Sequence, residues 1–201
     1  GKYLVSGVSV VNTIVIWDVN SGQKFKTLKG HSNTITSVSW SPDGKYLASG
    51  SLDKTVIIWD ARSGAKLRTL KGHSYSVFSV SWSPDAKYLA SSSNDNTVII
   101  WDSKSGQKIR TLDVHTNFLD CVSWSPDGKY LACSLDDGKV IIFDANSGQK
   151  IHTLDAGGGA DNSISWSPDG KYLASFSPYN TVIIWDANSG ECIQNLYQYI
   201  D

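Results

Sequence analysis

The chain repeats the same unit every 42 residues, and this internal period limits the possible folds more than any other feature of the sequence. Residues 43–84 and 85–126 are identical at 26 of 42 positions, and the spacing indicates no insertion or deletion in any repeat. Repeats that diverge naturally usually differ in loop length, so this register favours recent amplification or deliberate design. The period is most visible in five aromatic residues, Trp17, Trp59, Trp101, Phe143 and Trp185.

Each unit contains four segments with the character of β-strands. In the second unit these are residues 35–41, 45–51, 55–60 and 66–70. They are short, rich in β-branched and aromatic side chains, and bounded by turn residues such as Ser41-Pro42-Asp43-Gly44, which suit a type I turn. No segment shows helical periodicity over the length of a helix. Four antiparallel strands per unit, repeated around an axis, predict a β-propeller.

Composition narrows the class of protein further. A single Glu, Glu191, against 18 Asp argues against long helices, because Glu favours helices whereas Asp favours caps and turns. The net charge of −1 predicts neither a nucleic-acid nor a membrane partner, since proteins that bind these anionic surfaces are usually strongly basic. We also expect no transmembrane helix and no signal peptide. The absence of Met indicates a fragment, a processed product or an engineered chain.

Two dipeptides recur at a fixed offset within the repeats. Trp-Asp occurs at Trp17-Asp18, Trp59-Asp60, Trp101-Asp102 and Trp185-Asp186, and Gly-His occurs at Gly30-His31 and Gly72-His73. With these paired signals along its whole length, the chain resembles the WD-repeat β-propellers. The resemblance implies a ring of blades whose four strands, a to d, run from the axis to the rim. It also implies that the d–a loops and the b–c turns share one face, which we call the top face.

The repeats predict an all-β fold with a single domain over residues 1–201. Its blades are expected at about residues 1–33, 34–75, 76–117, 118–159 and 160–201. The expected fold is a β-propeller of five four-stranded antiparallel blades, the first lacking its innermost strand because the chain begins at strand b. The ring could close with one three-stranded blade, take the missing strand from another chain, or be an open arc of a larger ring. We favour the closed five-blade ring and expect blades one and five to be the loosest.

A His, a Ser, an Asp and a Trp occupy matching places in two repeats. They are His31, Ser49, Asp53 and Trp59, and then His73, Ser91, Asp95 and Trp101. His, Ser and Asp also make up a hydrolase triad, but a catalytic centre needs no copy 42 residues away. The resemblance implies that such tetrads are structural, so we expect them to satisfy buried polar groups and expect no catalytic residue. The pattern is weaker elsewhere, with Val11 at the Asp position of blade one.

The cysteines and histidines give no sign of a metal site. No group of them has zinc-ligand spacing and no phosphate-binding loop follows a strand, so we expect no metal and no cofactor. Three cysteines without a signal peptide favour free thiols and a cytoplasmic location. The alternative is a disulfide between Cys121 and Cys133, which flank one turn and would face each other across strands a and b.

Variation between the repeats concentrates in the segments assigned to the top face. The d–a loops and the b–c turns differ from repeat to repeat, whereas the Ser-Pro-Asp-Gly turns hardly change. Aromatic residues outside the repeat motif gather in the same variable segments, which is typical of a recognition surface. The resemblance to WD-repeat proteins implies partner contacts at the residue before the tetrad Asp and at the start of strand a. Together with the aromatic residues, the candidate partner-binding residues are Thr36, Leu52, Tyr75, Phe78, Asn94, Phe118, Asp120, Asp136, Asn162 and Tyr179.

Two functions of different classes fit these features. The first is a non-enzymatic interaction scaffold whose top face binds a peptide, a protein or a small polar ligand. In that case Asp120 and Asp136 would supply negative charge and Tyr75, Phe78 and Phe118 apolar contact, which favours a basic or aromatic-anchored ligand. The second is an engineered or structural propeller without an evolved ligand, which could form homo-oligomers through the open edge of its incomplete first blade. An enzyme is the least favoured alternative.

Overall fold

The structure is a computed structural model that describes residues 1–8, 11–114, 118–157, 163–177 and 181–197. Within these ranges the chain forms nineteen β-strands, which pair into five antiparallel sheets. The first sheet has three strands and each of the other four has four. The all-β fold and the three-stranded first blade predicted from the sequence are therefore confirmed. No helix in the described part of the chain is long and apolar enough to cross a membrane.

The strands follow the repeat units closely. The first blade consists of β1 (Tyr3–Val8), β2 (Thr13–Asp18) and β3 (Lys24–Lys29). The second consists of β4 (Ile35–Trp40), β5 (Tyr46–Ser51), β6 (Thr55–Asp60) and β7 (Lys66–Lys71), and the third of β8 (Val77–Trp82), β9 (Tyr88–Ser93), β10 (Thr97–Asp102) and β11 (Lys108–Asp113). The fourth consists of β12 (Leu119–Trp124), β13 (Tyr130–Leu135), β14 (Lys139–Asp144) and β15 (Lys150–Asp155), and the fifth of β16 (Ile164–Trp166), β17 (Tyr172–Ser177), β18 (Thr181–Asp186) and β19 (Cys192–Tyr197).

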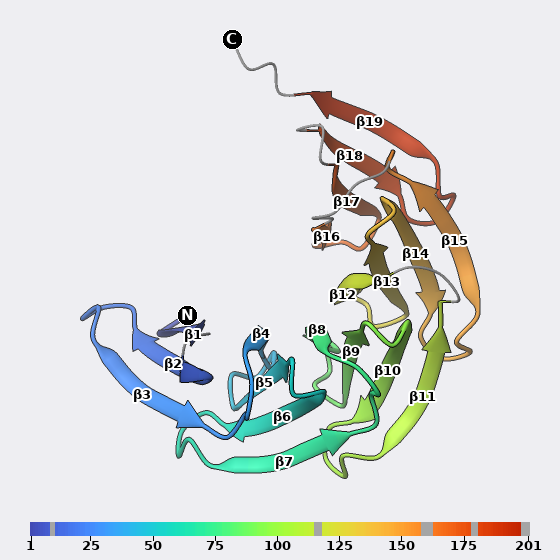
Figure 1. Ribbon diagram of the computed structural model, residues 1–201. Coiled ribbons are helices and arrows are strands. Elements are labelled where there is room, and N and C mark those ends of the chain that lie inside the picture. Colours follow the sequence, from blue (N-terminus) through green and yellow to red (C-terminus); the bar gives the residue numbers. More distant parts are fainter. Residues whose placement is uncertain (9–10, 115–117, 158–162, 178–180, 198–201) are drawn as a thin grey trace.

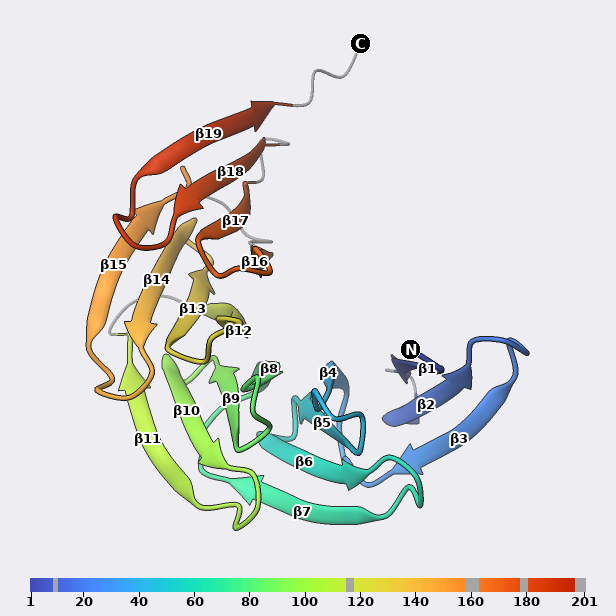
Figure 2. The ribbon, with the colours of Figure 1, turned by 180° about the vertical axis from the view of Figure 1, so that it is seen from behind.

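The five sheets are arranged along an arc, as the blades of a propeller are (Figure 1). In each four-stranded blade the first strand lies on the inner side of the arc and the last strand lies at the rim. The opposite view shows the same opening between the first blade and the fifth (Figure 2). The five blades thus form an open arc in this structure, and the closed five-blade ring favoured from the sequence is not observed.

The turns within a blade are closed by short-range hydrogen bonds. In the second blade Ser41 donates from its hydroxyl to Asp43 at 2.6 Å and accepts from the amide of Tyr46 at 2.9 Å. Gly44 completes this turn with a φ of 68°, in the left-handed region. Ala86 holds the equivalent place in the third blade with a φ of 59°, where its Cβ makes the conformation costly. The recurring turn sequence therefore determines the a–b connections, with backbone strain at Ala86.

The inner strand of the second, third and fourth blades contains one extra residue relative to its neighbour. In β4 the pairing with β5 shifts between Ile35 and Ser37, which leaves Thr36 as the unpaired residue. Phe78 in β8 and Asp120 in β12 hold the same position. A bulge of this kind breaks the regular alternation of side chains and redirects the extra residue. Three of the predicted partner-binding residues are thus bulge residues at the start of inner strands.

The first blade departs from the strict 42-residue register. β1 pairs Leu4 with Trp17, just as β5 pairs Leu47 with Trp59. Leu4 and Leu47 are therefore equivalent although they lie 43 residues apart. One additional residue is accommodated in the turn between β1 and β2, so the expectation of repeats without any insertion is wrong for this blade.

This insertion changes the assignments in the first blade. Ser6, not Gly7, is the counterpart of the tetrad serine Ser49, and it accepts a hydrogen bond from Nε1 of Trp17 at 2.9 Å. The alignment of Val11 with the tetrad aspartate is no longer fixed, because the insertion falls in the same turn. The spacing of the tryptophans could not reveal this extra residue, because it lies upstream of the first tryptophan, Trp17.

The hydrophobic core lies between neighbouring blades, and the two terminal blades each leave one apolar face uncovered. Leu47 packs in the cluster between the first and second blades and is 0% exposed, whereas its counterpart Leu4 has no preceding blade and is 62% exposed. At the other end of the arc Leu196 is 44% exposed, whereas its counterpart Leu70 is 3% exposed. The faces that internal blades bury are therefore open at both ends.

The three cysteines are free thiols, as expected. β12 and β13 pair Cys121 with Ser134 and Val122 with Cys133, so the two cysteines are offset by one residue. Side chains alternate along a strand, which places Cys121 against the fifth blade and Cys133 against the third. The alternative of a Cys121–Cys133 disulfide is wrong because the two thiols lie on opposite faces of one sheet. Burial raises the pKa of both thiols.

Candidate partner-binding face

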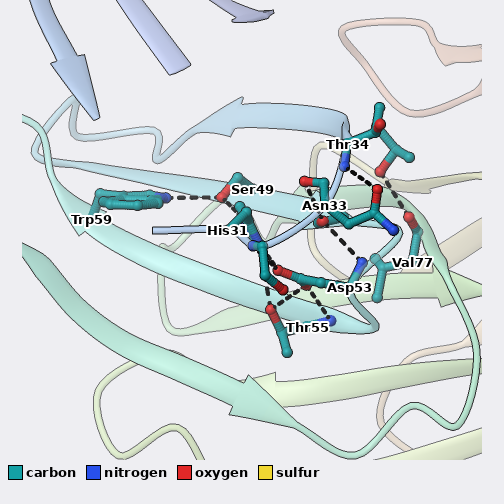
Figure 3. A network of polar contacts seen from close by, with 11 residues as sticks. His31, Asn33, Thr34, Ser49, Asp53, Thr55, Trp59 and Val77 are labelled. Atoms are coloured by element: carbon teal, nitrogen blue, oxygen red, sulfur yellow. Dashed lines mark hydrogen bonds and ion pairs between the residues drawn. The ribbon is translucent and has the colours of Figure 1, made fainter. Parts of the chain in front are cut away.

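A buried polar network anchors the loop that leads into β4 (Figure 3). Nδ1 of His31 lies 2.8 Å from Oδ2 of Asp53, and Nε2 of the same ring lies 2.8 Å from Oγ of Ser49. Trp59 donates from Nε1 to this Oγ, also at 2.8 Å. Because an ionised carboxylate only accepts, Nδ1 of His31 carries the proton of its bond to Asp53. These contacts tie the d–a loop to β5 and β6.

Asp53 also fixes the turn between β5 and β6. Its Oδ1 accepts from the hydroxyl of Thr55 at 2.6 Å, and its Oδ2 accepts from the amide of Ser32 at 2.9 Å. Burial acts to raise the pKa of Asp53, but the hydrogen bonds from Thr55, Ser32 and His31 outweigh it and hold that pKa below its ordinary value. The ionised carboxylate of Asp53 therefore links the d–a loop to the b–c turn, the two segments that form the top face.

The third blade repeats this network. His73 lies 2.9 Å from Asp95 and 2.8 Å from Ser91, and Trp101 donates to Ser91 at 2.8 Å. Burial again acts to raise the pKa of Asp95, and the hydrogen bonds from His73 and Thr97 lower it well below its ordinary value. Both tetrads thus have the same geometry and the same electrostatics.

A substrate cannot reach the serines of the two tetrads. Ser49 and Ser91 are both 0% exposed, and each hydroxyl is already engaged by an indole and an imidazole. A hydrolytic serine must be reached by its substrate and must keep Oγ available for attack. The arrangement instead satisfies polar groups that blade packing buries.

The network is reduced in the fourth and fifth blades. In the fourth blade the apolar Cys133 and Phe143 stand at the serine and tryptophan positions, and both are buried. In the fifth blade Trp185 still donates to Ser175 at 2.8 Å. The bond between the serine and the tryptophan is therefore kept in the fifth blade, whereas apolar residues take both positions in the fourth.

Backbone hydrogen bonds bring the d–a loops and the b–c turns together on one face. In each of the second to fifth blades a backbone amide at the end of the second strand, or just after it, donates to a backbone carbonyl in the loop before the first strand. The bonds are Leu52 to Thr34 at 2.9 Å, Asn94 to Ser76 at 3.1 Å, Asp136 to Phe118 at 3.0 Å and Phe176 to Ser163 at 3.0 Å. The two variable segments of each repeat are therefore adjacent in the second to fifth blades.

Large aromatic side chains are exposed on this face. Tyr75 is 61% exposed and Phe118 is 54% exposed, while Phe78 is half-buried at its bulge. Nζ of Lys54 lies 5.3 Å from the centre of the Tyr75 ring, a cation–π contact between the second and third blades. Aromatic rings so exposed on a rigid framework offer apolar contact area at low entropic cost.

Two carboxylates accompany Phe118 on the fourth blade. Asp120 is the bulge residue of β12, and Asp136 follows the end of β13, where Leu119 pairs with Leu135. Both aspartates are half-buried. Oδ1 of Asp136 is buried and has no hydrogen-bond donor among the residues that the structure describes. A buried acceptor without a donor is costly, so rotation of the half-buried Asp136 side chain towards a donor on a bound molecule would remove that cost.

The remaining candidates differ in their surroundings. Thr36 donates from its hydroxyl to the carbonyl of Val77 at 2.7 Å, so its polar group already serves the contact between the second and third blades. Leu52 and Asn94 are half-buried beside their loops. Asn162 and Tyr179 lie outside the described residues.

Lys54 was not among the residues singled out from the sequence, although it belongs to the same face. Its φ is 70°, and the equivalent residues Asn96 and Gly138 have φ values of 64° and 82°. Asn and Gly tolerate this left-handed conformation, whereas Lys does so rarely. A lysine at a turn position where the other repeats carry Asn or Gly was the available signal.

No cluster of three or more His, Cys, Asp or Glu side chains that could hold a metal ion occurs within the described ranges. The described part of the top face presents aromatic rings, carboxylates and the ammonium group of Lys54.

Comparison with known proteins connects this geometry to a family. Residues 1–195 match the family model described as the IFT122 first beta-propeller. A subunit of chromatin assembly factor 1 from Mus musculus is 41% identical over 51 residues, which are 25% of this chain and 9% of that protein. Ribosome assembly protein 4 of Chaetomium thermophilum is 61% identical over 36 residues, 18% of this chain and 7% of that protein. The intraflagellar transport protein 122 homolog of Xenopus tropicalis is 40% identical over 47 residues, 23% of this chain and 4% of that protein.

Each of these matches has about the length of one repeat and covers less than a tenth of the relative. The family match, by contrast, extends over nearly the whole chain and coincides with the five sheets. Together with the Trp-Asp and Gly-His signals and the two buried tetrads, it establishes the family. The chain belongs to the WD-repeat β-propellers, in the family of the IFT122 first beta-propeller.

Proposed function

We propose that this chain is a non-enzymatic interaction module whose top face binds a protein or a peptide that carries a basic group beside an aromatic or apolar anchor. The relatives named for chromatin assembly and for ribosome assembly support a protein partner only in this general sense. The buried tetrad serines support the absence of hydrolytic catalysis on this face.

The observation that carries the proposal is the pairing of Asp136 with Phe118. The amide of Asp136 is bonded to the Phe118 carbonyl, its Oδ1 is buried without a donor among the described residues, and the Phe118 ring is 54% exposed. The Asp136 side chain is half-buried, so its rotation lets an ammonium, guanidinium or amide donor of a ligand bond the carboxylate while the apolar part of the ligand covers the ring. Such a charge-assisted hydrogen bond is stronger than a neutral one.

Selection from a random peptide library displayed on phage provides the probe for this proposal. We expect enriched peptides to contain Lys or Arg close to an aromatic residue. Replacing Asp136 or Phe118 by Ala is expected to weaken binding about 30-fold, as for a hot-spot residue worth roughly 2 kcal/mol. Isothermal titration calorimetry with a selected peptide measures this change.

Asp144→Ala is the matched control for Asp136→Ala, because Asp144 is a carboxylate of the same blade that lies at the end of β14 and accepts from the amide of Ser147 at 2.6 Å in the c–d turn. It is expected to leave peptide affinity unchanged. Selected peptides whose affinity is the same for the wild type, Asp136→Ala and Phe118→Ala would show that the top face of this blade is not the binding surface.

A second candidate function is assembly through the terminal blades. Leu4 is 62% exposed and Leu196 is 44% exposed, although their counterparts inside the arc are buried, and Trp17 is 37% exposed. The two open faces carry the same residue types that meet at each internal interface, so each could be covered by the other end of the same chain or by a second copy. The mass in solution, measured by light scattering on a sizing column, distinguishes a monomer from an assembly.

A further inference from the structure

We infer that the rim of the first two blades, along the outer strands β3 and β7, binds an extended acidic peptide. This surface meets the top face at Lys54, lies two blades away from the Asp136–Phe118 pair of the fourth blade, and concerns a different ligand charge. Five lysines define it, and we call it the basic rim: Lys24, Lys29, Lys54, Lys66 and Lys71.

Positive and negative charges are unevenly distributed along the chain, although they nearly cancel in total. Residues 1–75 contain ten Lys and Arg against four Asp, and residues 118–201 contain four Lys against eleven Asp and Glu. The net charge of −1 is therefore the near-cancellation of a basic and an acidic half. Local charge, and not the total, determines which ligands a surface attracts.

The outer strands carry much of this difference at one repeated position. The last residue of the outer strand is Lys29 in the first blade and Lys71 in the second, but Asp113 in the third and Asp155 in the fourth. Lys24 and Lys66 begin the same two outer strands. The sign of the rim therefore changes between the second and third blades while the fold of the blades stays the same.

The four lysines of the basic rim that belong to outer strands lie on one side of their sheets, and Lys54 lies in the turn between β5 and β6. β6 pairs Thr55 with Lys71 and Trp59 with Lys66, and an irregularity in the register keeps both lysines on the side of the sheet that Thr55 shares. Arg68, one step out of this alternation, turns the other way and donates to the carbonyl of Lys104 in the next blade. In β7, Arg68 therefore serves the packing of one blade on the next, whereas Lys66 and Lys71 are exposed to solvent on the other side.

Two adjacent grooves run along this side. One, of about 420 Å³, is lined by Lys54, Lys66 and Lys71 together with Ser32, Thr55 and Thr69. The other, of about 700 Å³, is lined by Lys24 and Lys29 together with Thr13 and Thr27. Gly30 lines both, and a Cβ added there would come within 2.7 Å of Trp59, so the wall between the grooves is bare backbone.

Lysines outnumber carboxylates in these grooves, since Asp53 of the tetrad is the one acidic side chain among the described residues that line them. None of the five lysines lies within ion-pair distance of a carboxylate in the part of the chain that the structure describes. The lysines at the a–b turns differ, since Lys45, Lys87 and Lys129 each pair with a neighbouring Asp at 3.2–3.4 Å. The basic rim therefore offers cations and hydroxyl donors to an anionic ligand.

The strand edge favours a peptide over a nucleic acid. β3 and β7 are the last strands of their sheets, and each pairs with a single neighbour, so one row of backbone groups faces outward. An extended peptide can add to such an edge and place alternate side chains over the lysine side. Among the described residues no Phe, Tyr or Trp lines either groove, and the imidazoles of His31 and His73 at their borders are buried and bonded to the tetrad aspartates. The stacking that single-stranded nucleic acids use therefore has no exposed platform there.

The test uses a fluorescein-labelled polyglutamate peptide and fluorescence anisotropy at low ionic strength. We expect the wild-type chain to bind it, and the affinity to fall as salt is added because the contacts are screened. The combined variant Lys24→Gln, Lys29→Gln, Lys66→Gln and Lys71→Gln is expected to bind at least ~10-fold more weakly, since each exposed pair contributes little alone.

The matched control removes four lysines elsewhere, through Lys87→Gln, Lys108→Gln, Lys129→Gln and Lys150→Gln, and changes the net charge equally. It is expected to bind within about twofold of the wild type. An equal loss in both variants would mean that total charge and not the basic rim attracts the peptide, and no binding by the wild type would mean that the lysines only protect the strand edges from aggregation.

Two further outcomes overturn the proposal. The first is an oligodeoxythymidine of equal charge that competes more strongly than the peptide and loses affinity in the same variant, which would make the rim a nucleic-acid site. The second is an oligomer at low salt that the rim variant dissociates, which would make the acidic half of a second copy the occupant. Light scattering of both variants separates this case, and neither result bears on the top-face site.

Discussion

The rings of His31 and Trp59 lie edge to face, with their centroids 6.3 Å apart and their planes at 64°, because both are held by the hydroxyl of Ser49. The same arrangement recurs between His73 and Trp101 at 6.2 Å and 70°. One buried hydroxyl thus serves two rings, one from the loop before β4 and one from β6, and removing it leaves two polar nitrogens without a partner.

Ser49→Ala is therefore expected to destabilise the fold by about 1–3 kcal/mol, the cost of buried polar groups left unpaired. Ser6→Ala removes the equivalent hydroxyl in the first blade, where Trp17 is 37% exposed and water can replace it. The loss there is expected to stay below about 1 kcal/mol. Urea unfolding of the two variants measures the difference, and equal losses would contradict the burial argument.

Acid is expected to destabilise the second and third blades through Asp53 and Asp95. The folded structure lowers the pKa of both carboxyls, so their contribution is fully present above the unfolded pKa near 4 and is lost as the pH falls through the folded values. The double variant Asp53→Asn and Asp95→Asn should be less stable than the wild type at pH 7. Thermal unfolding between pH 7 and pH 2 should show this gap closing below about pH 4, and a gap independent of pH would refute the assignment.

Ala86→Gly is expected to stabilise the chain by about 1 kcal/mol, because the left-handed conformation at φ 59° costs an L-residue that much and costs Gly almost nothing. Gly44→Ala places the same strain in the second blade, where φ is 68°, and should destabilise by a similar amount. Denaturant midpoints of the two variants are expected to move in opposite directions. A destabilising Ala86→Gly would show that the methyl group makes a contact worth more than the strain.

Leu47→Ala is expected to cost about 3 kcal/mol, the range for truncating a fully buried leucine. Leu4→Ala, at the equivalent position on the uncovered face of the first blade, is expected to change stability by less than about 0.5 kcal/mol. The pair of variants also reports on the state in solution. A large loss at Leu4 that depends on protein concentration would mean that a second copy covers this face, and one independent of concentration would mean closure within the chain.

The 42-residue period and the strand signals predicted the all-β fold, the number of sheets and the tetrad residues, and these agree with the structure. Such features depend on short-range chemistry. Strand alternation, the Ser-Pro-Asp-Gly turns and the pairing of adjacent strands are each determined within one repeat. The strand signals therefore recur in five repeats, and the turn recurs four times, once with Ala86 in place of Gly.

Only the tertiary structure determined the features that depend on contacts between repeats or on strand register. The arc remains open because its curvature is set by the packing of one blade on the next, which the residues of a single repeat do not specify. Cys121 and Cys133 lie on opposite faces because a shift of one residue in register reverses a side chain, and sequence separation does not report that shift. The unsatisfied oxygen of Asp136 and the grooves of the basic rim arise in the same way, since burial and exposure depend on which atoms of neighbouring elements are near and not on the local sequence.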